Sequence, residues 1–187
     1  YTDVDIMSAR YAGALRSLDV TQGDRVLVQV DKSPYALLLY LATLRIGAIF
    51  VPLNTAYTPT EVAYFLGDAQ PRLFVARPKT EDDLVDIARN TGAALLTFDT
   101  DGAGSLADAM ANAEAVEEIA RTDANDIASI IYTSGTTGRS KGAMLSHDNL
   151  ASNALTLIDL WGFRETDVLL HALPIYHVHG LFVAVHC

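Results

Sequence analysis

The chain has 187 residues, of which 50% are hydrophobic and 19% are charged, and its formal net charge is −10. This length can bury one sizeable core, and the composition is ordinary for a soluble globular protein. The acidic balance argues against a nucleic-acid partner, and no apolar run is long enough for a membrane span. We expect no secretory signal, and the single cysteine, Cys187, fits a reducing, cytoplasmic location.

Helix and strand patterns alternate over residues 3–98. The predicted helices cover residues 3–18, 34–46, 59–68 and 80–90, and the predicted strands cover residues 25–30, 48–51, 72–76 and 94–98. Strand–helix alternation implies parallel crossovers, so we predict an α/β fold with largely parallel sheets flanked by helices. Residues 99–126 are predicted to be a surface loop with one or two short helices.

The most informative stretch is Tyr132–Gly142, which follows an apolar run over 127–131 that predicts a buried strand. Its glycines leave backbone N–H groups free to converge on an anion, because no Cβ blocks the approach. Its hydroxyl and cationic side chains add donors and positive charge. The predicted polyphosphate cradle consists of Thr133, Ser134, Gly135, Thr136, Thr137, Gly138, Arg139, Ser140 and Lys141.

Stretches of this composition are usually linkers or turns. Here a buried strand precedes the stretch, the apolar residues 143–145 follow it, and its cations sit inside the turn, where a linker has no use for them. The stretch is also not a Walker A loop, which needs Gly-Lys-Ser/Thr, because Ser140 precedes Lys141 and Gly142 follows it.

The stretch closely resembles the phosphate loop of the adenylate-forming superfamily of acyl-CoA synthetases, luciferases and peptide-synthetase adenylation domains. The family form is Thr-Ser-Gly-Thr-Thr-Gly-x-Pro-Lys-Gly. The chain matches it over 133–138 and at Lys141 and Gly142, and departs at Ser140, where proline is usual. The ending Gly-Arg-Ser-Lys-Gly looks like the malonyl-CoA synthetase branch.

Two further segments support this resemblance. Residues 44–54 look like an early structural motif of the family, Gly-Ala-x-x-Val-Pro-Leu-Asn, for which we expect packing and no catalytic role. Residues 54–58 also look like malonyl-CoA synthetases. We therefore expect residues 1–187 to be the N-terminal part of the large adenylation domain, with the small C-terminal domain absent. The chain ends inside the apolar run 181–185, which fits that expectation.

After the loop we predict a short strand, a helix from Ser146 with an apolar face through Trp161, and a strand over 168–170. The segment 171–180 that follows has three interpretations. Its histidines can be partly buried hydrogen-bonding groups at a strand end and turn. They can bind a metal, with His186 and Cys187 nearby, although the spacing matches no common zinc site. Resemblance to the family segment Leu-Pro-x-x-His instead places His177 on the wall of the acyl-substrate pocket.

The resemblance implies an ATP-dependent acid–thiol ligase. A carboxylate attacks the α-phosphate of ATP to give an acyl-adenylate and pyrophosphate, and coenzyme A then takes the acyl group. The cofactors implied are ATP, Mg²⁺ and coenzyme A, and malonate is the expected acid. Lys141 is the expected catalytic cation and Arg139 a weaker helper. The Mg²⁺ ligand, the adenine site, a hinge and a C-terminal lysine are expected in the remainder of the same polypeptide.

Three alternatives stay open. The acid can be another carboxylate, of short or medium chain or aromatic. The protein can be a P-loop-type phosphotransferase, which the missing Gly-Lys-Ser/Thr and the predicted strand after the loop oppose. It can also be a binding or structural module without ATP-dependent chemistry.

Overall fold

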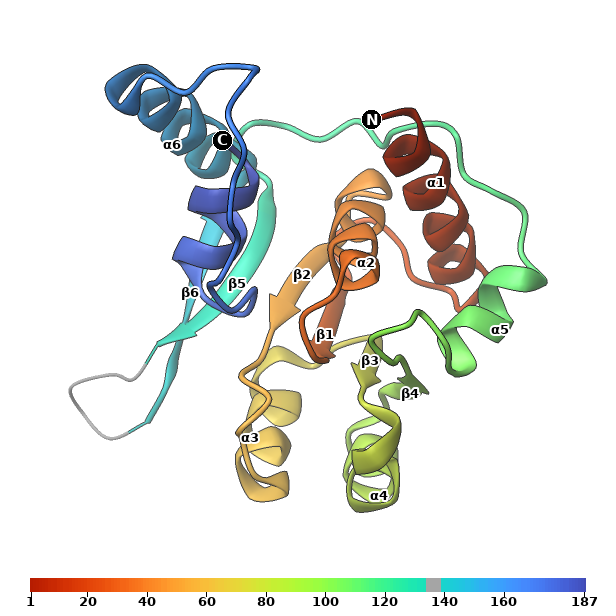
Figure 1. The fold of residues 1–187 in the computed structure, drawn as a ribbon. Helices are drawn as coiled ribbons and strands as arrows, with labels where there is room; N and C mark the ends of the chain where they lie inside the picture. Colours follow the sequence, from red (N-terminus) through yellow and green to blue (C-terminus); the bar gives the residue numbers. More distant parts are fainter. Residues whose placement is uncertain (134–138) are drawn as a thin grey trace. The chain divides into compact units, whose positions relative to one another are not determined.

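The computed structural model describes residues 1–133 and 139–187 (Figure 1). The chain forms two compact units, Tyr1–Arg121, here called unit 1, and Thr122–Cys187, here called unit 2. The elements of unit 1 are α1 (Thr2–Ser17), β1 (Arg25–Gln29), α2 (Pro34–Arg45), β2 (Ile49–Pro52), α3 (Pro59–Ala69), β3 (Leu73–Ala76), a 3-10 turn (Pro78–Thr80), α4 (Glu81–Thr91), β4 (Ala94–Thr97) and α5 (Ser105–Ala111). No described helix combines the length and apolar character needed to cross a lipid bilayer.

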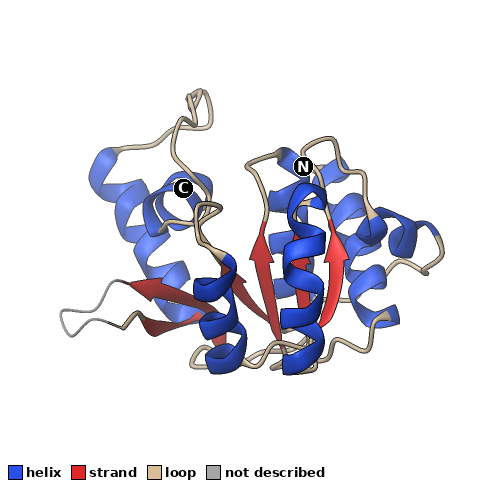
Figure 2. Cartoon of the chain, turned by 90° about the horizontal axis from the view of Figure 1, so that it is seen from below, coloured by secondary structure: helices blue, strands red, loops and turns tan. Residues whose placement is uncertain are grey.

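The strands of unit 1 are parallel and lie in the order β4-β3-β1-β2. Val26 on β1 lies opposite Phe50 on β2 and Leu73 on β3. The chain thus passes from β1 to β2 on one side, and then crosses back over β1 to β3 on the other side. Because such crossovers are right-handed, opposite steps place their helices on opposite faces, and Figure 2 shows helices on both sides of these strands. The predicted α/β fold is confirmed.

Local signals fix the ends of these helices as expected. The Ser33 hydroxyl accepts a hydrogen bond from the Ala36 N–H at 3.1 Å, and Pro34 begins α2. Thr58 and Glu61 form a reciprocal capping box at the start of α3, and these hydrogen bonds from Thr58 lower the pKa of the Glu61 carboxyl. Gly92 ends α4 at φ 77°, a left-handed conformation that glycine adopts without strain.

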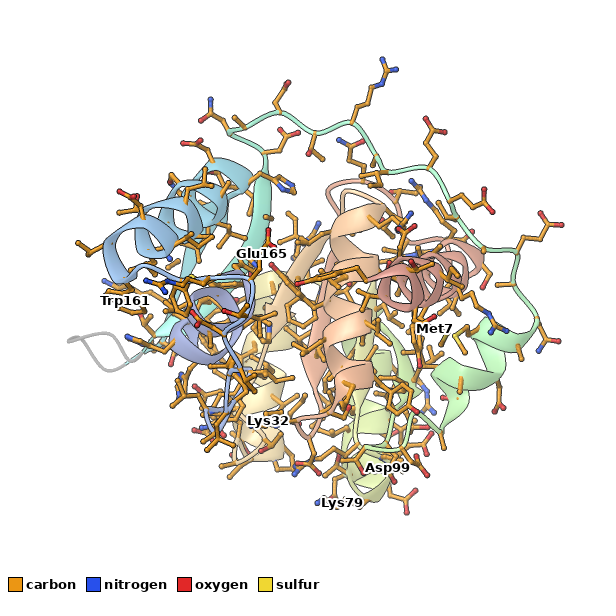
Figure 3. All side chains as sticks on the ribbon, turned by 45° about the horizontal axis from the view of Figure 1, so that its top comes forward. Met7, Lys32, Lys79, Asp99, Trp161 and Glu165 are labelled. Carbon is orange, nitrogen blue, oxygen red and sulfur yellow. The ribbon has the colours of Figure 1, made fainter. Side chains whose placement is uncertain are left out.

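The loop after β2 is held rigidly at the carboxyl end of the sheet. The Gln29 amide donates to the carbonyl oxygens of Asn54 and Tyr57 at 3.0 and 3.2 Å. Arg77 donates to the Thr55 carbonyl at 2.7 Å. Figure 3 labels Lys32, Lys79 and Asp99, which follow β1, β3 and β4 at this same edge. Within residues 44–54 the side chains of Ile46, Ala48, Phe50, Val51 and Leu53 are buried, in line with the expected packing role.

Arg45, the last residue of α2, ties the segment that leads out of unit 1 to two helices. Its side chain is only 7% exposed and pairs with the Asp5 carboxylate on α1. Its Nη1 donates to the Glu117 carbonyl at 2.6 Å, and its own carbonyl accepts from the Ala120 N–H at 2.8 Å. Arg45 therefore holds residues 117–120 at both ends, Glu117 through its guanidinium and Ala120 through its backbone carbonyl.

Replacing Arg45 by methionine is expected to lower the free energy of unfolding by about 2 kcal/mol, because the Glu117 carbonyl and the Asp5 carboxylate lose a charged donor whose own side chain is buried. Urea unfolding of the chain measures this loss. Arg72→Met is the matched control, because its pair with Asp19, at 3.0 Å, joins side chains that are 46% and 82% exposed. The control should lose less than about 0.5 kcal/mol. Equal losses in the two variants would contradict the role given to Arg45.

Unit 2 contains β5 (Ile127–Thr133), β6 (Lys141–Ser146), α6 (His147–Trp161) and a π-helix over His179–Val185. On α6, Leu150 and Ala154 are buried as its apolar periodicity predicts, whereas Trp161 is 58% exposed. The predicted strand over 168–170 is wrong. Its three side chains are 95%, 54% and 91% exposed, and no strand among the described residues pairs with it. An apolar run becomes a strand only where a partner satisfies its backbone groups.

Candidate functional site

The centre of unit 2 is an antiparallel hairpin formed by β5 and β6, which run side by side in Figure 1. Thr133, the last residue of β5, lies opposite Lys141, the first residue of β6, and both side chains are exposed. The hairpin therefore places a hydroxyl and an ammonium group together where the two strands end. These groups are the kinds of donor and cation that a polyphosphate needs.

The predicted phosphate loop falls between these two strands. Ser134, Gly135, Thr136, Thr137 and Gly138 lie outside the described residues, so their predicted role stays a prediction. Arg139 is exposed and Ser140 is half-buried directly before β6. Lys141 was expected inside the loop, but its backbone is paired with Thr133 in the β5–β6 ladder. This pairing fixes the position of the Lys141 Cα, from which the side chain extends. A strand, and no helix, follows the loop.

The other end of the hairpin is anchored to the start of α6. The Ser146 hydroxyl accepts from the Asn149 N–H at 3.2 Å, and the Asn149 side chain accepts from the Ser146 N–H at 3.1 Å. The backbone N–H groups of His147 and Asp148 donate to the carbonyls of residues 126 and 124 at 3.0 and 2.9 Å. The start of β5 and the end of β6 are thereby joined through the first turn of α6.

The antiparallel pairing of β5 and β6 was missed by the sequence analysis. Two apolar runs separated by a glycine-containing stretch are typical of a hairpin, and this signal was present. The register was not readable from sequence. Ile127 lies opposite Ser146 but Ser129 lies opposite Leu145, so β5 carries one extra residue, a bulge, at Ala128.

The histidine segment is described in full. His171 contacts the Gly180 carbonyl through its Nε2 at 2.8 Å, as the hydrogen-bonding interpretation expects. A side chain at Gly180 would meet the Pro174 carbonyl oxygen at 2.0 Å from its Cβ, so only glycine fits there. His177 is exposed, and its ring lies 4.7 Å from that of Tyr176, centroid to centroid.

His179 and His186 lie on or after the π-helix that follows this turn. His179 begins it and is exposed. His186 is half-buried, its ring centroid lies 5.5 Å from that of Phe182, and burial lowers the pKa of its imidazole. Among the described residues, no three His, Cys, Asp or Glu side chains are grouped as a metal site. Cys187 instead lies 3.9 Å from the Ala154 carbonyl oxygen.

Comparison with known proteins gives several ligases. Over 197 aligned residues the chain is 34% identical to 4-coumarate–CoA ligase 5 of Oryza sativa subsp. japonica, covering 100% of this chain and 35% of that protein. It is 39% identical over 147 residues to the mitochondrial malonate–CoA ligase ACSF3 of Xenopus laevis, covering 75% of this chain and 24% of that protein.

The solved structures agree in fold. The ATP-bound MatB of Rhodopseudomonas palustris superposes with a TM-score of 0.94 at 53% sequence identity, over 98% of this chain and 37% of that one. A benzoate CoA ligase from Burkholderia xenovorans LB400, at 24% identity and a TM-score of 0.88, shares the fold over 100% of this chain and 37% of its own. The chain thus spans between 24% and 37% of the length of these relatives.

One protein-family model, described as "AMP-binding enzyme", matches residues 1–187, the whole chain. The match includes the β5–β6 hairpin and the stretch between its strands, which the resemblance had identified as a phosphate loop. The chain belongs to the AMP-binding enzyme family.

Proposed function

We propose that this chain is the ATP-binding front part of an AMP-forming acid–CoA ligase that makes malonyl-CoA from malonate. The observation that carries the proposal is the pair at the loop end of the hairpin. There Thr133 and Lys141 lie opposite each other, both exposed, on the two sides of a family phosphate-loop sequence. A relative named as a CoA ligase matches the whole chain, this hairpin included. Since the chain spans 37% of the MatB structure, the complete reaction is assigned to a polypeptide of the relatives' length, here called the family-length enzyme.

The chemistry explains why a cation is needed at this hairpin. Acyl-adenylate formation brings a carboxylate towards a polyphosphate, so two anions must approach each other. The Lys141 ammonium and the Thr133 hydroxyl would bind phosphate oxygens, with Arg139 as a more exposed second cation. At ~4 Å and an effective dielectric constant near 20, one such cation contributes about 4 kcal/mol of gross Coulomb energy.

Mg²⁺ and coenzyme A complete the proposal. Mg²⁺ supplies further charge neutralisation on the β- and γ-phosphates when it is bound with ATP. At the loop end of the hairpin the described residues contribute hydroxyl and ammonium groups. Such groups bind phosphate oxygens better than they bind a metal ion. We therefore propose that the Mg²⁺ ligands, and the lysine of the small domain, belong to the remainder of the same polypeptide. We propose a reducing, cytoplasmic setting, because the one cysteine leaves no intrachain disulfide.

The choice of malonate rests on similarity. The MatB structure shares 53% identity, and a malonate–CoA ligase is among the relatives. The second candidate is a ligase for an aromatic or fatty acid, because relatives named 4-coumarate–CoA ligase and long-chain-fatty-acid–CoA ligase also match nearly the whole chain. A P-loop phosphotransferase is disfavoured, because that loop leads into a helix and this stretch leads into β6.

A product assay tests the proposed reaction. The family-length enzyme can be the natural polypeptide, or the 187 residues joined to the rest of the R. palustris MatB in place of the matching segment. With ATP, coenzyme A and malonate, we expect AMP, pyrophosphate and malonyl-CoA. The 187 residues alone are the negative control and should form no acyl-CoA. Release of ADP, or no nucleotide chemistry with any acid, would overturn the proposal.

A further inference from the structure

We propose that Tyr132 is a positioning residue for ATP binding. Its ring covers Gly142 on the facing strand, sets the register of the β5–β6 hairpin and thereby orients Lys141. This inference rests on the proposed function. Tyr132 and Gly142 flank the predicted phosphate cradle and do not belong to it, so the role assigned to them is an additional one.

The geometry places the Tyr132 ring against a strand position without a side chain. Tyr132 and Gly142 are direct partners in the antiparallel ladder. A Cβ added to Gly142 would lie 2.7 Å from the Ile130 Cγ2 and 3.4 and 3.5 Å from two carbons of the Tyr132 ring. The space over Gly142 is therefore filled by these two side chains of β5, and any larger residue at 142 must displace one of them.

An aromatic ring over a cross-strand glycine compensates for the packing that glycine cannot supply. This matters on β6, because its first residues are Lys141, Gly142 and Ala143, and a strand with small residues specifies its register weakly. The bulge at Ala128 adds to the problem, since the ladder changes register there. The pairs between the bulge and the loop must therefore fix the register by their own contacts.

The register of the β5–β6 pairing decides on which face of the hairpin the Lys141 side chain lies. Side chains alternate between the two faces of a strand, so a slip of one residue moves every side chain of β6 to the opposite face. The Tyr132–Gly142 pair is adjacent to the Thr133–Lys141 pair, one step further from the loop. Holding the first pair in place therefore keeps the Lys141 ammonium on the same face as the Thr133 hydroxyl.

The test compares four variants of the family-length enzyme by calorimetric binding of Mg·ATP and by pyrophosphate-exchange kinetics. Tyr132→Ala should weaken ATP binding and raise the KM for ATP on the order of tenfold, while the KM for the acid changes by less than about twofold. Gly142→Ala should act in the same direction. Tyr132→Phe keeps the ring and should restore wild-type values, because the ring carbons of Tyr132 are what lie over Gly142.

Met144→Ala is the matched control. Met144 lies on the same strand and face as Gly142, opposite Ile130, but two pairs further from the loop, and its side chain is 67% exposed. It should bind ATP as the wild type does. Unchanged ATP affinity in Tyr132→Ala and Gly142→Ala, equal losses of affinity for ATP and acid, or failure of Tyr132→Phe to restore binding would each overturn the inference.

The two proposals fail in different ways. ATP binding is read directly, so it reports on Tyr132 even if the enzyme activates an acid other than malonate. If Tyr132→Ala does not fold, Gly142→Ala still tests the same contact from the other strand. If the wild-type enzyme binds ATP but releases no pyrophosphate with any acid, the proposed function fails, whereas the variant series still decides the inference on Tyr132.

Discussion

Lys141→Ala in the family-length enzyme is expected to slow acyl-adenylate formation by roughly 10- to 1,000-fold, which corresponds to about 1.4–4 kcal/mol of transition-state stabilisation. The ammonium group would lie beside phosphate oxygens whose charge must be offset as the carboxylate attacks. Lys141 begins β6 and is exposed, so the change should leave the fold intact. A slower rate with unaltered stability is therefore the expected pair of results.

Pyrophosphate exchange with ATP and acid, in the absence of coenzyme A, measures this step. Lys79→Ala is the matched control, because Lys79 is also an exposed lysine, 66% accessible, and pairs with Asp31 in unit 1 at 3.5 Å. It should exchange at the wild-type rate, and Lys141→Arg should recover part of the loss by restoring the charge. Wild-type exchange by Lys141→Ala would remove Lys141 from the proposed ATP site.

Unit 1 could be predicted almost entirely from sequence because its signals are local. Ser33 and Thr58 precede prolines and cap their helices, and Gly92 ends α4, so each boundary lay within a few residues of the pattern. The strands β1, β2 and β3 are buried on both faces and read as short apolar runs. The order of the strands, by contrast, depends on the connection from β2 to β3, which crosses over β1. No local sequence pattern encodes that crossing.

Unit 2 was harder because its structure depends on contacts between segments. Residues 168–170 have the composition of a strand but no partner strand among the described residues, so the strand predicted from composition was wrong. Lys141 looked like a loop residue because it lies between glycines, whereas pairing with Thr133 places it in β6. The Tyr132–Gly142 pair was not predictable because the register changes at the bulge at Ala128, and a bulge has no reliable sequence signal here.

The candidate substrate site was predictable only in part. The sequence pointed to His177, and the structure places it exposed beside Tyr176, so its role in binding an acid stays a prediction. His171 lies in the same segment, but its ring is hydrogen-bonded to the Gly180 carbonyl and holds the turn. The two histidines can therefore be separated by experiment: one is a candidate for binding, and the other for structure.

Malonate selectivity tests this separation. A dicarboxylate has one carboxylate at the α-phosphate and a second that must meet donors or a cation, because an unpaired buried charge is costly. A pocket built for a fatty acid would be lined with apolar groups instead. We therefore expect the family-length enzyme to favour malonate, and to a lesser extent methylmalonate, over butyrate by on the order of 100-fold in kcat/KM.

His177→Ala should erode this preference while leaving the KM for ATP unchanged, because the imidazole would act as a donor to the distal carboxylate and not to phosphate. The expected loss in kcat/KM for malonate is about 10-fold, with butyrate little affected, since butyrate offers that donor no partner. His171→Ala is the contrasting variant: it removes the contact to Gly180 and should lower stability and affect both acids alike. Competition kinetics with the two acids measure the ratio directly. A kcat/KM for butyrate that equals or exceeds that for malonate would rule out malonate as the substrate and leave adenylate formation at the hairpin standing.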